Sequence, residues 1–494
     1  MKILFPLFTL IVAGIVPVFA QERPNILFIL SDDHSAPWVG CYGTSNVRTP
    51  TLDKLAAEGM RFNRFFCVAP QCVPSRAGMM TGRSAVAARM TRFSAPLPRE
   101  ETIFPEVLRQ AGGYYTGVCG RIYHLDGSGT RNAGVSLKTF QDNKLVTFPD
   151  RMDFVEVGDQ RRNGERFSAF LDQVPKGRPF FFWANTSDPH HPWDATDLQL
   201  DPKSLQLPGY MPDTPAMREA FAAYLGEINR LDGLVHDVLA VLEKRDLVKN
   251  TIVVFTGDNG MALPHGKGAL YDPGLNTPLI VRWPGHVKPG SVTDELVSGE
   301  DYGPTLIAAA GLQAPTRMSG HNFLPLLLGE SYQGRKYLFA ERGVHGGAIL
   351  RTDTKANAID FSRMVRSDRY KLIYNFTTHF PYAPVDSSGM AYWKQMAADH
   401  ASGRLAAPLD KAYFTLPRPI YELFDLQTDP NELNNLSGQP ATAAVEKELK
   451  EALTQKMILD WDYLPLPDMA PPPMPGAKGG SDEQTKGKGR KKNN

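Results

Sequence analysis

The stretch "NILFILSDD" (Asn25–Asp33) is a continuous apolar run that ends in two carboxylates. Apolar residues without polar alternation are typical of a strand covered on both faces, as in a parallel or mixed sheet. Two further stretches have the same character: "PFFFWANT" (Pro179–Thr186) and "TIVVFTGDNG" (Thr251–Gly260), the latter ending in Asp258 and Asn259. The sequence therefore predicts buried strands at these places, two of them followed by a pair of oxygen-bearing side chains.

Amphipathic helices are expected between these strands. The stretch "TPTLDKLAAEG" (Thr49–Gly59) offers a capping threonine, a proline at the first helical position and a glycine at the end. A longer helix is expected to begin at Thr214 and to keep apolar residues at helical spacing as far as Leu242. Strands that alternate with helices predict a layered α/β domain.

The pattern changes after about residue 345. "MVRSDRYKLIYNF" (Met364–Phe376) and "IYELFDLQTDP" (Ile420–Pro430) alternate like strands of an antiparallel sheet. A long segment between them, 377–418, is expected to be a loop, and a last helix is expected over Thr442–Leu459. The C-terminal part is therefore predicted to be a smaller subdomain of antiparallel sheet plus helix.

Both ends of the chain differ in composition from the rest. Lys2, the apolar run after it and a small-residue cleavage site at Ala20 are typical of a secretory signal peptide, with a membrane anchor as the alternative. The Pro/Gly/Lys-rich tail is predicted to be disordered, with contact to an anionic polymer as a further possibility. The expected division is a signal peptide at 1–20, an α/β domain at 21–345, a C-terminal subdomain at 346–466 and a tail at 467–494.

Composition excludes several classes of partner. The 494 residues include 54 Lys and Arg against 53 Asp and Glu, so no overall field favours nucleic acid or a membrane surface. No later stretch is long and apolar enough to span a bilayer, so no stable membrane anchor is expected, and the mature chain is expected to be secreted or periplasmic. The four cysteines match no zinc or disulfide framework, although one disulfide is possible. Cys41, Cys67 and Cys119 are interpreted as small core residues.

The two acidic pairs predict a metal site. In an open α/β sheet, ligands bind beyond the carboxyl ends of the strands. If the two strands run in the same direction, Asp32 and Asp33 meet Asp258 and Asn259 at one edge. Oxygen ligands without a histidine cluster suit Ca²⁺ or Mg²⁺. One such pair alone is better explained as a helix cap, whereas two pairs at equivalent strand ends leave a metal site and helix capping equally open.

The stretch "PQCVPSRAGMMTGR" (Pro70–Arg83) places a cysteine just before a proline, a serine and an arginine. Pro74 and Ser75 are typical of the start of a helix, whose N-terminus offers free N–H groups and the positive end of a dipole. Arg76 adds a fork of permanent donors. Cys72 is therefore predicted to face an anion-binding site.

This stretch resembles the sulfatase signature Cys-x-Pro-Ser-Arg with the Thr-Gly-Arg that follows it. The resemblance covers nearly the whole mature chain except the tail, and its C-terminal part looks most similar to heparan N-sulfatase and related glycan sulfatases. It is carried further by "ILSDDHSAPWVGCYG", "TPTLDKLAAEGMRF", "GRIYH" (Gly120–His124), "DPHHP" (Asp188–Pro192), "FTGDNG" with "HGKGALYDPGLNTPLIV" (His265–Val281), "RYKLIYN" and "ELFDLQTDPNELNNL".

The resemblance implies an alkaline phosphatase-like fold, with a large mixed sheet sandwiched by helices. It also implies that a maturation enzyme converts Cys72 to formylglycine. The hydrated aldehyde would carry two hydroxyls: one attacks the sulfur of a bound sulfate, and the second expels the sulfate by collapse to the aldehyde. One Ca²⁺ per chain would be held by Asp32, Asp33, the modified Cys72, Asp258 and Asn259.

Further site residues follow from the resemblance. Arg76 would hold the modified side chain, His124 would assist its hydroxyl, His190 would protonate the leaving group, and Lys267 would lie beside the sulfate. Arg121 departs from the family, which usually has lysine there. Arginine keeps the charge but cannot serve as a proton donor.

The implied activity is hydrolysis of sulfate esters or N-sulfates of a sulfated saccharide. The residues expected to contact the sugar are His265, His379 and Trp393, with Tyr382 and Tyr413 beside them, although packing is an equal explanation for aromatic residues in a long loop. One alternative is a phosphodiesterase or phosphonate monoester hydrolase of the same fold. Another is a calcium-bound anion-binding protein in which Cys72 stays unmodified.

Overall fold

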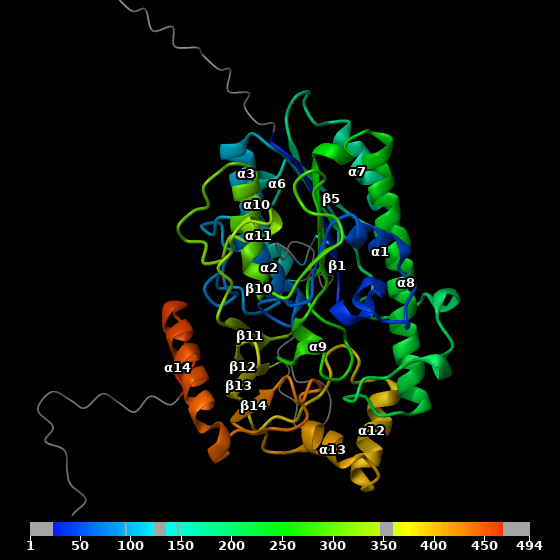
Figure 1. Ribbon diagram of the computed structural model, residues 1–494, viewed down its shortest axis with the longest axis vertical. Helices are drawn as coiled ribbons and strands as arrows, with labels where there is room; N and C mark the ends of the chain where they lie inside the picture. The colour runs from blue at the N-terminus through cyan, green and yellow to red at the C-terminus, as the bar shows by residue number, and fades with distance from the viewer. Residues whose placement is uncertain are drawn as a thin grey trace, which may run out of the picture.

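A mixed eight-stranded sheet forms the centre of the larger part of the molecule (Figure 1). The computed structural model describes residues 23–93, 96–122, 124, 135–145, 148–345 and 359–467. The strand order is β5-β4-β6-β1-β7-β8-β2-β9. The strands are β1 (Asn25–Ser31), β2 (Met60–Phe62), β4 (Tyr115–Gly120), β5 (Phe154–Val157), β6 (Phe180–Asn185), β7 (Thr251–Gly257), β8 (Leu279–Arg282) and β9 (Ser291–Thr293).

The middle of this sheet is parallel. β1 pairs in parallel with both β6 and β7, and β4 pairs in parallel with β6, so four neighbouring strands end at the same edge. β7 and β8 then pair antiparallel. Every residue of β1 is buried, with Ile26 and Phe28 in the core on one face and Leu27 and Ile29 in the core on the other. This two-sided burial explains the unbroken apolar runs in the sequence.

Helices cover both faces of the sheet. One face packs against α1 (Pro50–Ala57), α7 (Asn163–Leu171) and the long α8 (Pro215–Lys244). The other packs against α2 (Cys72–Thr81), α3 (Phe104–Gly112), α10 (Tyr302–Ala309) and α11 (Leu324–Leu327). The α/β layers predicted from the sequence are thus confirmed. Shorter elements are β3 (Phe65–Phe66), paired with β10 (Val297–Ser298), and the helices α5 (Val135–Asp142), α6 (Phe148–Arg151) and α9 (Asp272–Leu275).

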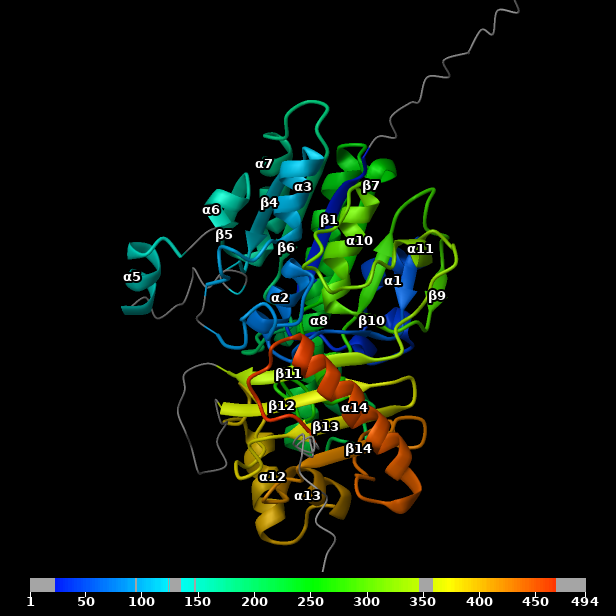
Figure 2. The same cartoon turned by 90° about the vertical axis from the view of Figure 1, so that its left-hand side faces the viewer.

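A four-stranded antiparallel sheet lies beyond the carboxyl edge of the large sheet, in the lower half of Figure 2. Its order is β11 (Leu338–Val344), β12 (Ile359–Arg366), β13 (Tyr370–Asn375) and β14 (Tyr421–Asp425). The helix α14 (Ala443–Leu459) packs on one face. The sheet-plus-helix architecture expected for the C-terminal part is therefore present.

Two expectations about this subdomain were wrong. Its first strand begins at Leu338, ahead of the boundary expected at 345, because β11 pairs with β12 and not with the large sheet. The segment 377–418 is not one loop, since it contains α12 (Ala391–Ala401) and α13 (Ala407–Phe414). The helix α12 contacts α8 and contributes to their shared aromatic core, so long-range packing stabilises helices that the local pattern did not predict.

A threonine N-cap was expected for two helices, and the structure confirms it for one of them. Thr214 accepts a hydrogen bond from the Met217 N–H at 3.2 Å, as an N-cap should. Thr49 precedes α1 but accepts instead from the Gly40 N–H at 2.8 Å. The expected signal peptide lies outside the described residues, and so does the expected tail apart from its first residue, so both stay predictions.

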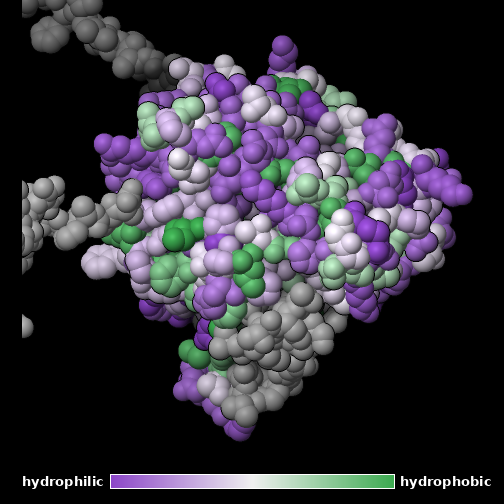
Figure 3. Space-filling view, turned by 90° about the horizontal axis from the view of Figure 1, so that it is seen from below, coloured by the Kyte–Doolittle hydropathy of each residue, from purple (hydrophilic) through white to green (hydrophobic). Residues whose placement is uncertain are grey.

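Cys67 and Cys119 are buried core residues as expected, whereas Cys41 is only partly buried. All four cysteines are unpaired. The face viewed in Figure 3 is mainly hydrophilic where it is coloured, with scattered apolar side chains. Among the described residues, no helix combines the length and the apolar character that crossing a membrane requires.

Glu341 joins the two parts of the molecule and supplies a test of the fold. Its backbone N–H donates to Val68 O at 3.0 Å, and its carboxyl accepts from the Val86 N–H at 2.6 Å. Burial raises the pKa of the Glu341 carboxyl from 4.5 to about 7, although Arg363 opposes this shift. The folded protein therefore keeps a proton that the unfolded chain has already lost, and this group's contribution to stability falls as pH rises from about 4.5 to 7.

We expect Glu341→Gln to remove this dependence. Urea unfolding across that pH range should show that the advantage of wild type over the variant shrinks by up to about 3 kcal/mol. Glu219→Gln, at an exposed position of α8, is the control. A wild-type advantage that grows with pH would contradict the assignment.

Candidate active site

The two acidic pairs meet at the carboxyl edge of the large sheet. β1 and β7 are in register to their last residues, so the residues that follow them emerge side by side. Asp32, Asp33, Asp258 and Asn259 are all fully buried. The Asp33 N–H donates to Asp258 Oδ1 at 3.0 Å, and Asn259 Nδ2 donates to Asp33 Oδ1 at 2.8 Å. The convergence inferred from the strand ends is therefore present.

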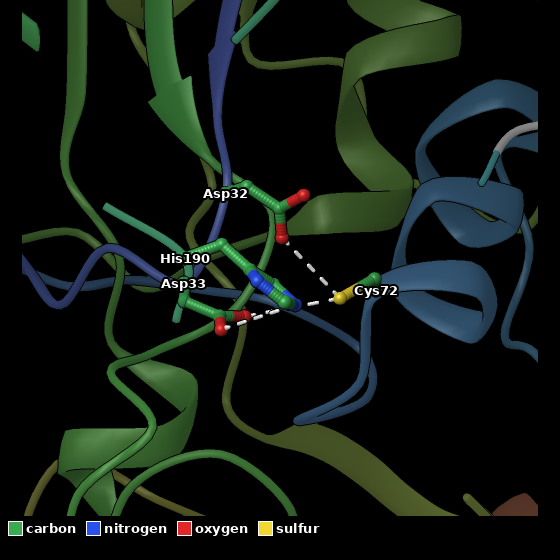
Figure 4. Close-up of side chains that lie close together, drawn as sticks. All are labelled: Asp32, Asp33, Cys72 and His190. Atoms are coloured by element: carbon green, nitrogen blue, oxygen red, sulfur yellow. Dashed lines mark hydrogen bonds and ion pairs between the residues drawn. The ribbon is translucent and has the colours of Figure 1, made fainter. Parts of the chain in front are cut away.

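The first turn of α2 brings Cys72 to these carboxylates. The helix begins at Cys72 itself, two residues earlier than the expected start at Pro74. Cys72 Sγ lies 3.3 Å from Asp32 Oδ1 and 3.8 Å from Asp33 Oδ1 (Figure 4).

Arg76 lies one turn further along α2 and links the two strand ends. Its Nε is 2.7 Å from Asp258 Oδ2, and its Nη2 is 3.0 Å from Asp32 Oδ2. All three side chains are fully buried. A buried guanidinium between two carboxylates compensates charges that could not otherwise stay ionised away from water.

The charges around Cys72 decide its chemistry. Burial and the neighbouring Asp32 raise the pKa of the Cys72 thiol well above its usual range. An unmodified Cys72 is therefore a neutral thiol and a weak nucleophile at neutral pH. The two carboxyl groups beside Cys72 differ in pKa. Burial alone would raise the pKa of Asp32, but Arg121 and Arg76 outweigh it and hold this pKa low. Burial raises the pKa of Asp33 to about 8, although Lys267 opposes this shift.

The neighbouring strands β4 and β6 supply further groups. Arg121 follows β4, and its Nε lies 3.0 Å from Asp32 Oδ2. Its Nη2 is 3.2 Å from His190 Nε2, on the loop after β6. His124 Nδ1 is 3.9 Å from Asp32 Oδ2. Burial, reinforced by Lys267 and Arg121, lowers the pKa of His190 well below its usual range, so its imidazole is neutral here.

Lys267 completes the cationic side of the site. It lies on the loop after β7, and its Nζ is 3.0 Å from Asp33 Oδ2. The same Nζ is 2.7 Å from Asp386 Oδ2, a residue of the C-terminal subdomain. The structure thus gathers Cys72, Arg76, Arg121, His124, His190 and Lys267 around the acidic pairs.

Two residues at this site were missed by sequence analysis. Asp386 contacts both Lys267 and His190, and His345 follows β11 with its Nε2 3.6 Å from Asp386 Oδ1. His345 Nδ1 also lies 3.3 Å from Nε2 of Gln71, the residue before Cys72. Neither residue belongs to a recognisable motif, so no local signal in the sequence pointed to them.

The pocket fits a cation. One ligand atom from each of Asp32, Asp33, Cys72 and His190 lies within 4.8 Å of the others. Asn259 Oδ1 is buried and has no hydrogen-bond partner among the described residues, so this oxygen is available to bind a metal ion. The oxygens of Asp258 already accept from the Asp33 and Asn259 N–H groups and from Arg76.

Two of the expected sugar contacts are ruled out. His265 is fully buried, with its ring centroid 4.1 Å from that of Tyr271. Trp393 is buried against Tyr382 and Phe414 on the inner side of α12. These rings build the core between α8 and the C-terminal subdomain and cannot touch a substrate. His379 is exposed in the turn after β13, and its role in sugar binding stays a prediction.

Comparison with known proteins identifies the family. The sulfatase family model matches residues 24–312, and the model of the C-terminal region of N-sulphoglucosamine sulphohydrolase matches residues 264–386. The chain therefore belongs to the sulfatase family, whose members hydrolyse sulfate esters. The alternative activity, on phosphodiesters or phosphonate monoesters, would be a difference in substrate specificity on the same fold, and it leaves the family assignment unchanged.

Relatives match over most of the chain. An ulvan-active sulfatase of Formosa agariphila is 29% identical, with 90% of this chain and 77% of the relative covered. Human arylsulfatase A is 30% identical over 88% of this chain and 87% of the relative. A structure solved with its substrate D-glucosamine-2-N,6-O-disulfate superposes with a TM-score of 0.66 at 19% identity, covering 90% of this chain and 99% of the other. At that identity the likeness concerns the fold, and it confirms the expected alkaline phosphatase-like architecture.

Replacing Arg76 tests the charge balance of the site. In protein treated with a chelator, Arg76→Ala should lower the free energy of unfolding by about 3–5 kcal/mol, because it leaves two buried carboxylates without their counter-charge. Arg162→Ala is the control, since Arg162 pairs with Glu165 at an exposed position and should matter little. Equal effects of the two substitutions in urea unfolding would contradict this account.

Proposed function

We propose that this protein is a secreted sulfatase that removes sulfate from a sulfated saccharide, using a formylglycine made from Cys72 and one Ca²⁺. The observation that carries the proposal is the position of Cys72 Sγ, within 3.8 Å of carboxylate oxygens of both Asp32 and Asp33. Fixed cations surround the same place. A sulfate ester needs this combination of a nucleophile and several positive donors.

The chain's own residues would share the work. Asp32, Asp33, Asp258 and Asn259 would hold the cation, with residue 72 as a further ligand. The bound Ca²⁺ would supply a Lewis acid for sulfate oxygens, and the hydrated formylglycine would supply the nucleophilic hydroxyl. Without modification, the raised pKa of the Cys72 thiol leaves no strong nucleophile in the pocket.

Arg76 and Arg121 would stabilise negative charge without exchanging protons. Lys267, held by Asp33 and Asp386, would bind a sulfate oxygen. His190 would serve the leaving group. Its Nε2 accepts from Arg121 in the free protein, so donation requires protonation, which the negative charge of a bound sulfate would favour.

A saccharide is the substrate class that the relatives favour. One relative is named for its activity on ulvan, and a protein of the same fold was solved with a disulfated glucosamine. The match of the C-terminal part to N-sulphoglucosamine sulphohydrolase supports a sulfated amino sugar. The signal-peptide pattern at 1–20 supports export, and a formylglycine-generating enzyme would act on the chain beforehand.

The phosphate-directed alternative also has an observation behind it. A phosphonate monoester hydrolase from Silicibacter pomeroyi shares the fold, with a TM-score of 0.64 at 21% identity. Parallel assays with sulfate esters, phosphodiesters and phosphonate monoesters separate the two activities. The sulfatase proposal expects sulfate esters to give the highest kcat/KM.

The state of residue 72 is the first test. Protein co-expressed with a formylglycine-generating enzyme should yield a Cys72 peptide of lower mass, because oxygen replaces the thiol, and should release sulfate from defined saccharides. Cys72→Ala should abolish turnover, whereas Cys41→Ala should leave it unchanged. Full sulfate release by the Cys72→Ala variant would exclude the proposed nucleophile.

Metal removal is the second test. Adding Ca²⁺ to chelator-treated protein should raise its stability by about 2.7 kcal/mol at a hundredfold excess over the dissociation constant. Asn259→Leu should reduce this gain, because it removes a buried oxygen that faces the site. Asn375→Leu, which removes a buried amide of β13, is the control. A gain that is the same in both variants would place the ion elsewhere.

A further inference from the structure

Asp386 brings a fourth carboxylate to the site from the C-terminal subdomain. Its Oδ2 lies 2.7 Å from Lys267 Nζ and 3.7 Å from His190 Nε2, and its Oδ1 lies 3.6 Å from His345 Nε2. Its side chain is 30% exposed, whereas those of Asp32 and Asp33 are fully buried. Asp386 is therefore the carboxylate of this group that is open to solvent.

The backbone holds Asp386 in a strained position. Its φ is +66°, in the left-handed region that residues other than glycine seldom adopt. The next residue, Ser387, is fully buried, and its Oγ donates to Ala262 O at 2.5 Å. Ala262 lies on the same loop as Lys267. The fold thus fixes Asp386 against the lysine, and such strain is often found at functional sites.

Acidic and basic side chains surround the site. Among the described residues, the carboxyl groups of Asp32, Asp33, Asp258 and Asp386 lie against the permanent cations Arg76, Arg121 and Lys267. Burial alone would raise the pKa of Asp386, but Lys267 and His345 hold it below its usual range. The negative charge of Asp386 therefore offsets part of the positive charge of Lys267.

We propose that Asp386 determines specificity by the charge of the ester: its carboxylate lies beside Lys267 and His190 and offsets the positive charge that meets the ester, so that the site accepts monoanions and disfavours dianions. This inference rests on the proposed function. A sulfate ester carries one negative charge, whereas a phosphate monoester carries nearly two at neutral pH. A phosphodiester also carries one, so the selection concerns charge and not the choice between sulfur and phosphorus.

Asp386 can be changed without dismantling the site. Asp32, Asp33 and Asp258 are proposed metal ligands or neighbours of Cys72, and their loss would disturb binding of the ion. Asp386 contacts Lys267 and two imidazoles instead. Asp386→Asn keeps the size and one acceptor for Lys267, and asparagine tolerates the left-handed backbone.

The test compares esters of different charge. For Ca²⁺-loaded enzyme with modified Cys72, kcat/KM is measured at pH 8 for an aryl sulfate, the corresponding aryl phosphate and the bis-aryl phosphate. Asp386→Asn should raise the ratio of aryl phosphate to aryl sulfate turnover by about tenfold, because the variant lacks a negative charge that repels the phosphate dianion more than the sulfate monoanion. The ratio of diester to sulfate turnover should stay the same.

Asp410→Asn is the matched control. Asp410 also lies in the C-terminal subdomain and pairs with a histidine, His400, at 2.6 Å, and its side chain is 42% exposed. It should change neither ratio. If Asp386→Asn lowers all activities equally, or leaves the phosphate-to-sulfate ratio unchanged, Asp386 is only a structural support and the proposal is wrong.

Binding separates this proposal from the proposed function. In the Cys72→Ala background, calorimetry with phenyl phosphate and phenyl sulfate reports charge selection without turnover. Asp386→Asn should shift relative affinity about tenfold towards phenyl phosphate. If this shift occurs while modified wild type releases no sulfate, the selection by charge stands and the proposed function fails. If sulfate is released but the relative affinity does not shift, the proposed function stands and the selection by charge fails.

Discussion

The burial of Asp32, Asp33 and Asp258 at one edge of the sheet is the constraint on which the rest of the site depends. Carboxylates this far from water need fixed positive charge close by. Arg76 provides it from α2, because its guanidinium reaches the ends of both β1 and β7. The start of that helix consequently lies at the sheet edge, and Cys72 comes within 3.3 Å of Asp32. The contacts of Arg76 that compensate the buried charges therefore also place Cys72 at the sheet edge.

The C-terminal subdomain contributes to chemistry as well as to stability. His345 follows β11 and lies against Gln71, the residue before Cys72. The loop after β13 supplies Asp386, which holds Lys267 together with Asp33. A site formed between two packed parts of a protein receives side chains that neither part could position alone. In this protein, loops next to the antiparallel sheet bring Asp386 to Lys267 and His345 to Gln71.

Much of the large domain was predictable because its strands are buried on both faces and its motifs are local. The run before Asp32 and the run before Asp258 identify neighbouring strands, and Cys72 and Arg76 stand one helical turn apart. The remainder depends on contacts between distant segments. Asp386 lies in an irregular loop more than a hundred residues beyond Lys267, and α12 is stabilised by packing against α8. For the same reason, Trp393 looked like a sugar contact in the sequence yet lies in the core.

The central claim is that one divalent cation, residue 72 and several fixed cations share a single pocket. A crystal structure of the matured protein, grown with Ca²⁺ and collected for anomalous signal, tests this most directly. The account predicts one calcium peak with oxygen ligands from Asp32, Asp33, Asp258 and Asn259 and from the side chain at position 72, at about 2.3–2.6 Å. A calcium peak remote from position 72, or no peak between the two acidic pairs, would contradict it.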